Sequence, residues 1–197
     1  MLADLEYVRN DAAESFISRP AEPANGHRTN AAATKNGLTM RTARAIEAPA
    51  ILELINLVFR EKRYCSPAGF SRIEDIERRM KLGKFLLAEN ENQIVGCAYV
   101  ELRLEASRLG LLAVAPSQQR AGIGSQLLEA AERLSISMHF LFMHLRIVNL
   151  HWEALSFCRR RGYVEFGIES LSGDQPVSLH CHFVRMFKQL KPDCAAF

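Results

Sequence analysis

The residue types best suited to chemistry lie in a short loop between two apolar segments. The loop reads Gln119-Arg120-Ala121-Gly122-Ile123-Gly124 and joins a predicted buried strand at 108–115 to a predicted helix. The N–H groups in the first turn of a helix have no partner within the helix, and the helix dipole adds positive potential there. Gly122 and Gly124 let a ligand approach the backbone without a Cβ in its path, and Arg120 adds a charged donor. We therefore predict that this loop binds an anion such as a diphosphate.

Glycines at such a turn also have a purely structural interpretation, because they allow a helix to pack closely against the preceding strand. A pair of glycines alone does not distinguish the two interpretations. Two other phosphate-binding motifs are excluded. The chain has no Gly-x-x-x-x-Gly-Lys-Ser/Thr sequence, and Leu127 stands where a dinucleotide-binding motif needs its third glycine.

The sequence around the loop resembles the Gcn5-related N-acetyltransferase (GNAT) superfamily. The six loop residues match the Gln/Arg-x-x-Gly-x-Gly/Ala motif of that family, and the flanking Val114-Ala115-Pro116 and Leu127-Leu128 also match. Segments 85–99 and 157–163 are similar to the family's second hairpin and to its late helix and turn. The resemblance covers residues 38–190. It implies an enzyme that transfers acetyl from acetyl-CoA directly to a primary amine of a small molecule or peptide.

The resemblance also implies where the cofactor binds. Residues 111–114 should pair their backbone with the pantetheine arm, and the N–H groups of residues 119–125 should hold the pyrophosphate. The strands at 108–115 and 140–148 should separate and leave a slot for the thioester. The cofactor-binding residues implied in this way are Leu112, Ala113, Val114, Gln119, Arg120, Ala121, Gly122, Ile123, Gly124, Ser125 and His151.

Two positions depart from the family's pattern. Cys158 stands where the family has a tyrosine that gives a proton to the departing CoA sulfur, and it is the candidate catalytic residue. A thiol can protonate a thiolate but is a weaker hydrogen-bond donor. The alternative is that Cys158 is a small buried residue and that water is the acid. His151 stands where many members have an asparagine that contacts pantetheine, and it could cap the helix, reach the cofactor or lie in solvent. A structural histidine with satisfied hydrogen bonds is the interpretation we favour.

The missing tyrosine leaves a second function open, a non-catalytic acyl-CoA-binding or regulatory module of the same fold. A third alternative is an interaction protein in which the glycines serve only packing. The candidates for a general base are Glu101, Glu105 and His144. His180 and His182 share one face of a predicted strand. Two ligands without a third do not make a metal site, and we predict none.

Eleven elements are predicted to position these residues, in the order β-α-α-β-β-β-α-β-α-β-β. The predicted strands span 38–45, 84–90, 93–104, 108–115, 140–148, 163–171 and 177–190, and the predicted helices span 46–62, 71–82, 121–134 and 151–161. Ser71 and Glu74 resemble a capping box at the start of the second helix, and Gly83 is its predicted end. The fold class is α+β in three layers (α/β/α), with a mixed, mostly antiparallel central sheet of about six or seven strands and helices on both faces. The resemblance identifies it as the acyl-CoA N-acyltransferase (GNAT) fold.

The chain has 197 residues, which suits one domain with additional segments. Residues 1–37 are predicted to be an N-terminal extension, with a short helix followed by a linker rich in turn formers at 20–37. The acetyltransferase domain is predicted to span 38–190, and residues 191–197 form a C-terminal tail.

Charge and cysteine content limit the possible partners. The net charge of +3 is too small to indicate nucleic acid, and no apolar run reaches the roughly 18 residues of a membrane span. The five cysteines form no Cys-x-x-Cys pair, which indicates a reducing compartment. We therefore predict a cytoplasmic protein whose partner is the amine acceptor, and a homodimer remains open.

Overall fold

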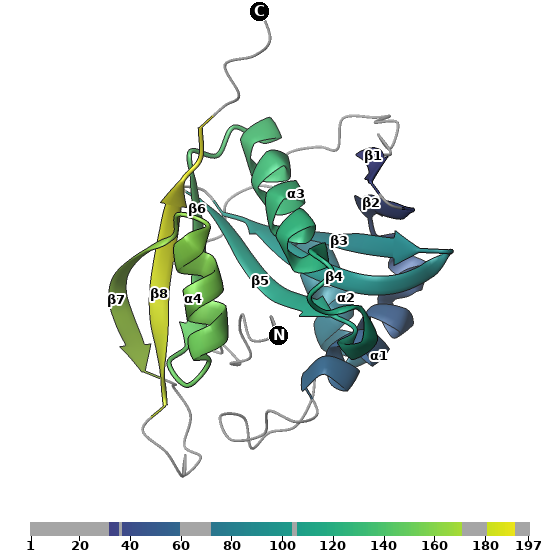
Figure 1. Cartoon of the computed structure of the whole chain (residues 1–197), viewed down its shortest axis with the longest axis horizontal. Coiled ribbons are helices and arrows are strands. Elements are labelled where there is room, and N and C mark those ends of the chain that lie inside the picture. The colour runs from purple at the N-terminus through teal and green to yellow at the C-terminus, as the bar shows by residue number, and fades with distance from the viewer. Residues whose placement is uncertain (1–31, 36, 60–71, 104–105, 171–180, 192–197) are drawn as a thin grey trace, which may run out of the picture.

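The computed structural model of the chain describes residues 32–35, 37–59, 72–103, 106–170 and 181–191 (Figure 1). The strands are β1 (Ala32–Lys35), β2 (Leu38–Thr42), β3 (Gly83–Asn90), β4 (Gln93–Leu102), β5 (Ser107–Val114), β6 (Phe142–Val148), β7 (Val164–Ser170) and β8 (His182–Gln189). The helices are η1 (Ala45–Glu47), α1 (Ala48–Phe59), α2 (Ile73–Leu82), η3 (Pro116–Gln118), α3 (Ile123–Ser137) and α4 (Trp152–Arg160). The predicted N-terminal helix and residues 192–197 of the predicted tail lie outside the described residues.

All eight strands form one sheet in the order β1-β2-β3-β4-β5-β6-β8-β7. Every neighbouring pair is antiparallel except β5 and β6, which are parallel. The predicted fold class is confirmed, a mixed and mostly antiparallel sheet with helices on both faces. The additional strand is β1, which lies within the predicted linker at 20–37. It pairs with β2 at the edge of the sheet. None of the helices in the described residues is long and apolar enough to cross a membrane.

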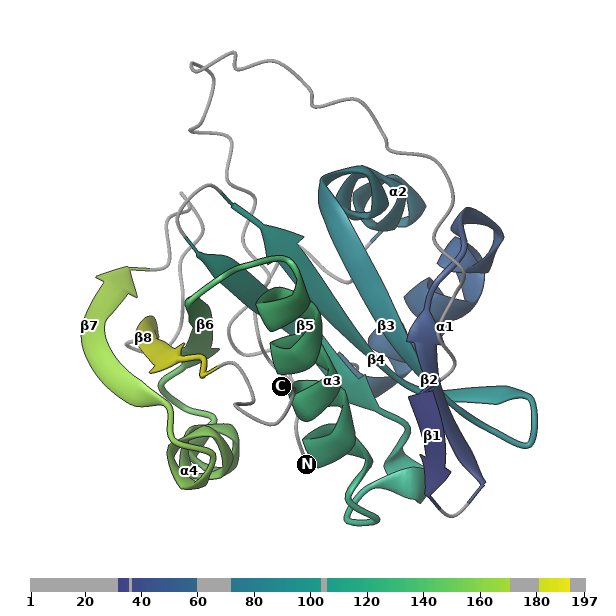
Figure 2. The same cartoon turned by 90° about the horizontal axis from the view of Figure 1, so that it is seen from above.

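Two apolar cores lie on opposite faces of the sheet. Figure 2 shows α1 and α2 on one side and α3 and α4 on the other. The helical spacing predicted for α1 is confirmed, because Ile51, Leu54 and Ile55 are buried in the core beneath α1 and α2. The core on the other face contains Leu127 and Leu128 of α3. The nearly continuous apolar sequence of β5 follows from this arrangement, since both faces of that strand are covered.

The start of α2 differs from the predicted capping box by one residue. The first turn of α2 follows Arg72, whose backbone N–H donates to the carboxylate of Asp75 at 3.3 Å. Asp75 therefore has the role predicted for Glu74. The predicted N-cap residue, Ser71, lies outside the described residues. Either carboxylate adds a negative charge to the first helical turn, so the sequence pattern locates the helix but not its exact register.

Two glycines are required by close packing rather than by a turn. Gly83 ends α2 as predicted, but its backbone is extended, and a Cβ there would lie 2.3 Å from the carbonyl oxygen of Val100. A Cβ on Gly96 of β4 would lie 2.9 Å from the side chain of Leu127 and 3.2 Å from the carbonyl oxygen of Ala113. Gly96 thus allows α3 to lie close to the sheet beside β5.

β5 and β6 separate along their length. They pair only near their N-terminal ends, where Arg108 lies opposite His144. Further along β5, its register against β4 shifts between residues 97 and 99, and Leu111 has a φ of 47°. A left-handed conformation is unusual for a bulky residue, and a bulge of this kind bends its strand. β5 therefore turns away from β6 (Figure 1), and the predicted separation of the two strands is observed.

Candidate functional site

The predicted anion-binding loop connects the end of β5 to the start of α3 through η3. Arg120 and Gly122 both have left-handed backbone conformations, with φ of 64° and 82°. The side-chain amide of Gln119 donates a hydrogen bond to the carbonyl oxygen of Val114 at 3.0 Å. This bond closes the loop back onto the end of β5, and the glycine at position 122 then turns the chain into α3.

The first turn of α3 presents its backbone N–H groups at this loop. The first hydrogen bond across the helix start runs from the N–H of Gln126 to the carbonyl oxygen of Gly122 at 3.1 Å. The N–H groups of Ile123, Gly124 and Ser125 precede it, so they have no acceptor within the helix. The N-cap is Gly122, which has no side chain to cap them, and a Cβ there would meet no atom within 4 Å. The geometry suits an anion at the start of α3.

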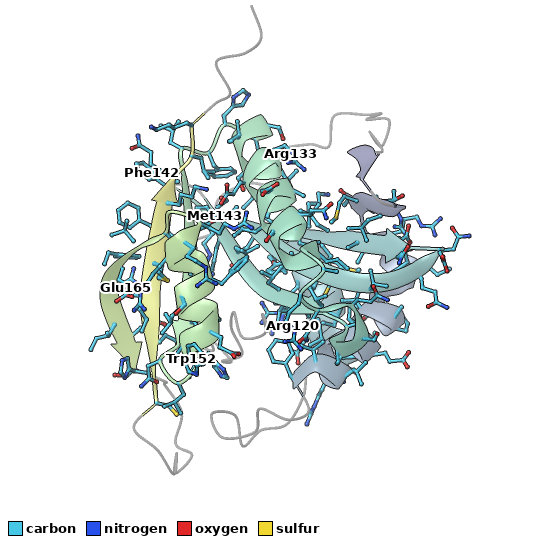
Figure 3. The ribbon with its side chains drawn as sticks, viewed as in Figure 1. Arg120, Arg133, Phe142, Met143, Trp152 and Glu165 are labelled. Carbon is cyan, nitrogen blue, oxygen red and sulfur yellow. The ribbon has the colours of Figure 1, made fainter. Side chains whose placement is uncertain are left out.

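A cleft of about 530 Å³ lies beside this helix start, between the loop and one face of α4. It is lined by Val114, Gln118, Gln119, Arg120, Gly122, Gly124, Ser125, Trp152, Glu153, Ser156, Phe157 and Arg160. Figure 3 labels Arg120 on the loop and Trp152 at the start of α4, on the two sides of this cleft. The cleft lies at the end of β5, where that strand has moved away from β6.

Six of the predicted cofactor-binding residues line the cleft: Val114, Gln119, Arg120, Gly122, Gly124 and Ser125. Ala121 belongs to the same loop and is exposed. Leu112, Ala113 and Ile123 are buried and do not line the cleft, and backbone contacts are the only ones that the prediction assigns to them. The loop and the first turn of α3 thus form one wall of the cleft, and cofactor binding by these residues stays a prediction.

The second wall comes from α4, and no motif in the sequence predicts it. Glu153, Ser156, Phe157 and Arg160 follow one another at helical spacing on the face of α4 that lines the cleft. Trp152 lies at the rim with 69% of its surface exposed. A tryptophan near the start of a predicted helix is the one sequence signal for this wall, since the arginine run at 159–161 is also typical of an ordinary helix end.

Cys158 lies on the opposite face of α4, in the core. Only 1% of its surface is exposed, and it does not line the cleft. Burial, with a further contribution from the nearby Glu132, raises the pKa of its thiol to about 12. Glu132 also accepts hydrogen bonds from Tyr163 Oη at 3.0 Å and Lys188 Nζ at 2.7 Å. The burial of Cys158 favours the alternative in which it is a small buried residue and water is the acid. The role of Cys158 as an acid stays a prediction.

His151 is the N-cap residue of α4 and is 8% exposed. Its side chain makes no capping hydrogen bond and does not line the cleft, whereas its carbonyl oxygen accepts from the N–H of Leu155 at 3.0 Å. Of the three alternatives for its side chain, exposure to solvent and helix capping do not occur. The neighbouring Asn149 joins β6 to β8, because its Oδ1 accepts from the N–H of His182 at 3.1 Å.

The candidate bases lie away from the cleft. Glu101 pairs with Arg103 at 3.1 Å, and Glu105 is outside the described residues. His144 pairs with Arg108 where β5 and β6 begin to separate. Burial and then the charges of Arg185 and Arg108 lower the pKa of His144, so its imidazole is neutral near pH 7. Within the described residues no three potential ligands gather as a metal site, and His180 lies outside them.

Comparisons with known proteins agree with this geometry. Residues 81–165 match the family model of the acetyltransferase (GNAT) domain. A search of curated proteins finds no significant match to the sequence. Among solved structures, the ribosomal-protein-S18-alanine N-acetyltransferase from Escherichia coli has a TM-score of 0.67 at 15% identity, with 81% of this chain and 99% of that one covered. A ribosomal-protein-alanine N-acetyltransferase from Brucella melitensis has a TM-score of 0.62 at 20% identity, over 77% and 99% of the two chains.

A third similar structure is a GNAT family acetyltransferase from Elizabethkingia anophelis with acetyl-CoA bound. Its TM-score is 0.65 at 21% identity, over 79% of this chain and all of that one. Identities this low establish a shared fold and carry no information on the acceptor. The matched residues include the loop, the separating strands and all of α4. The chain therefore has the GNAT fold, and its residues 81–165 match the family's acetyltransferase domain.

Proposed function

We propose that the protein is an acetyl-CoA-dependent N-acetyltransferase that moves acetyl directly to a primary amine of a small molecule or peptide. One observation carries the proposal: the open N–H groups at the start of α3 face a cleft at the C-terminal end of β5, where that strand no longer pairs with β6. A strand that has lost its neighbour offers backbone groups to an extended ligand, and a helix start offers donors to phosphates. Acetyl-CoA has both parts, a pantetheine arm and a diphosphate.

The residues of the loop fit such a cofactor. The open space at Gly122 and its left-handed φ leave room for a diphosphate against the backbone. Arg120 has no hydrogen-bond or ion-pair partner among the described residues and lines the cleft, so it is available to an anion. Acetyl-CoA supplies an activated thioester, and the chain supplies the position of that thioester and the proton transfers around it.

The acceptor amine would approach from the face of the sheet opposite α3 and α4, because the cofactor occupies the other side. On that face His144 lies 5.4 Å from Phe166 and 6.4 Å from Phe187, measured between ring centroids. Arg185 stacks over Phe166 at 4.5 Å. The neutral His144 is then the described candidate best suited to remove a proton from the amine. The departing thiolate takes its proton from water, since the thiol of Cys158 is buried.

Calorimetric titration with acetyl-CoA tests cofactor binding. We expect binding to the full chain, and its absence at millimolar cofactor contradicts the proposal. Gly122→Glu places a negative charge where the phosphates would lie and should abolish binding. Gly122→Ala is the matched control, because it introduces the same left-handed strain without charge and should retain binding within about tenfold, or about 1.4 kcal/mol. Equal affinities for both variants would refute the assignment of the loop.

Acetyl transfer itself needs a separate measurement. A panel of amines, amino acids and peptides, with released CoA thiol as the readout, identifies the acceptor. The buried Cys158 in the tyrosine position also supports the alternative of a non-catalytic acyl-CoA-binding module. Acetyl-CoA binding without thiol release across the whole panel favours that alternative, whereas release above the rate of hydrolysis with any amine favours the enzyme.

A further inference from the structure

We propose that Arg160 of α4 binds the 3′-phosphate of coenzyme A, so that this protein distinguishes the cofactor from its dephosphorylated form. The inference rests on the proposed function. It adds a specific contact from the second wall of the cleft, which the resemblance to the family did not assign.

Arg160 is the middle residue of three consecutive arginines that have different surroundings. Arg159 Nε donates to the carboxylate of Glu165 at 2.8 Å, and Arg161 Nη1 donates to Glu129 at 2.9 Å. Arg160 has no hydrogen-bond or ion-pair partner within the described part of the chain. It is also the one member of the run that lines the cleft. The two neighbours serve the structure, and the middle guanidinium is available to a ligand.

The position of Arg160 is fixed relative to α3. Arg161 donates a hydrogen bond to the hydroxyl of Ser125 in the first turn of α3, and its guanidinium stacks over Phe157 at 5.4 Å. The end of α4 is thereby tied to the start of α3. Arg160 lies directly before Arg161 and lines the same cleft as Gly124 and Ser125, whose N–H groups are proposed to hold the diphosphate.

The charges of the cofactor and of the cleft suggest how they pair. In the proposed complex, the N–H groups of α3 and Arg120 bind the diphosphate. The ribose 3′-phosphate then still needs a cation. Arg160 is the other arginine among the residues that line the cleft. The one acidic lining residue, Glu153, is seven positions earlier on α4, about 10 Å away along the helix axis. A guanidinium matches a phosphate through paired hydrogen bonds.

The test compares coenzyme A with 3′-dephospho-coenzyme A on the wild type, Arg160→Gln and Arg159→Gln. Affinity is measured by calorimetry and, independently, by the fluorescence of Trp152, the one tryptophan of the chain, which lines the cleft. We expect the wild type to prefer coenzyme A by about 10- to 100-fold. Arg160→Gln should remove this preference and leave the affinity for the dephosphorylated form unchanged. Arg159→Gln, which loses only the contact to Glu165, should keep the preference.

Three results would overturn the inference while leaving the proposed function intact. Arg160→Gln could weaken both ligands equally, which places the contact on the diphosphate. It could weaken neither, which places Arg160 outside the bound complex. The wild type could also bind both ligands with equal affinity. Failure of the wild type to bind either ligand would instead overturn the proposed function, and this inference with it.

Discussion

Two cysteine side chains, Cys97 and Cys158, are fully enclosed by the two cores. Cys97 lies between β3 and β5 on the α1 side of the sheet, and Cys158 lies beneath α4. Burial raises the pKa of both thiols to about 12 from their ordinary value of 9.0. Both side chains are therefore protonated at neutral pH and behave as small apolar groups.

Because the pKa of both thiols is raised, we predict that the free energy of unfolding decreases at high pH. Their pKa is higher in the folded state, so their contribution is complete below about pH 9 and is lost as the pH rises toward 12. The slope approaches about 1.4 kcal/mol per pH unit for each thiol. Urea unfolding between pH 8 and 11 measures it. The double variant Cys97→Ala/Cys158→Ala should show a shallower decline than the wild type, and parallel curves would contradict the assignment.

At the scale of elements, the junction between α2 and β3 depends on one glycine. Gly83→Ala would place a Cβ 2.3 Å from the backbone oxygen of Val100, which belongs to the paired strand and cannot move aside alone. We expect a loss of about 1–3 kcal/mol. The matched control is Gly167→Ala in β7, where a Cβ meets no atom within 4 Å. Thermal unfolding of both variants checks this, and equal melting temperatures would show that the junction relaxes without cost.

A network of ion pairs joins β2, η1 and the C-terminal end of β3, away from Gly83 at the start of that strand. Arg41 donates to the carboxylates of Glu47 and Glu89, at 2.9 Å in each case. The backbone N–H of Arg44 also donates to Glu47 at 2.7 Å. The hydrogen bond from Arg41, more than any other contact, lowers the pKa of Glu47 from 4.5 to about 2.

The network predicts a specific loss of stability in acid. Because the pKa of Glu47 is lower in the folded state, its contribution is present above about pH 4.5 and is lost as the pH falls toward 2. Glu47→Gln removes the titrating group and should make the decline between pH 5 and 2 shallower. Denaturant titrations of both proteins measure the difference. If their stabilities fall in parallel, another carboxylate accounts for the acid sensitivity.

The site is formed by several helices and strands together. Some of these elements could be predicted from the sequence, and others could not. Apolar spacing located α1 and the buried β5, and the glycine loop located the start of α3, because both depend on neighbours in the chain. The bulge at Leu111 carries no local signal, since leucine does not favour a left-handed φ, and only the pairing with β4 imposes it. The separation of β5 from β6 was accessible only through the resemblance to the family.

In the second wall of the cleft, the partners of the side chains depend on tertiary packing and could not be predicted from the local sequence. Arg159, Arg160 and Arg161 are identical in type and adjacent in sequence, yet two have carboxylate partners and one lines the cleft. Which arginine is available depends on the positions of Glu129 and Glu165, and these follow from the packing of α4 against α3 and β7. A composition rule for helix ends treats the three alike.

At the scale of the whole molecule, the described domain should be stabilised by its cofactor. A ligand that binds only the folded state adds about 2.7 kcal/mol at a concentration 100 times its dissociation constant. For a domain of this size we expect saturating acetyl-CoA to raise the melting temperature by about 5–10 °C. Differential scanning fluorimetry measures the shift. Gly122→Glu should show none, and an equal shift in that variant would place the ligand elsewhere.

The most direct measurement of the central claim is a crystal structure of the protein with acetyl-CoA bound. We predict that the diphosphate lies within hydrogen-bond distance of the N–H groups of Ile123, Gly124 and Ser125, and that the pantetheine arm follows β5 into the gap beside β6. Acetyl-CoA bound elsewhere on the molecule, or bound in the cleft with its phosphates away from the start of α3, would contradict the account.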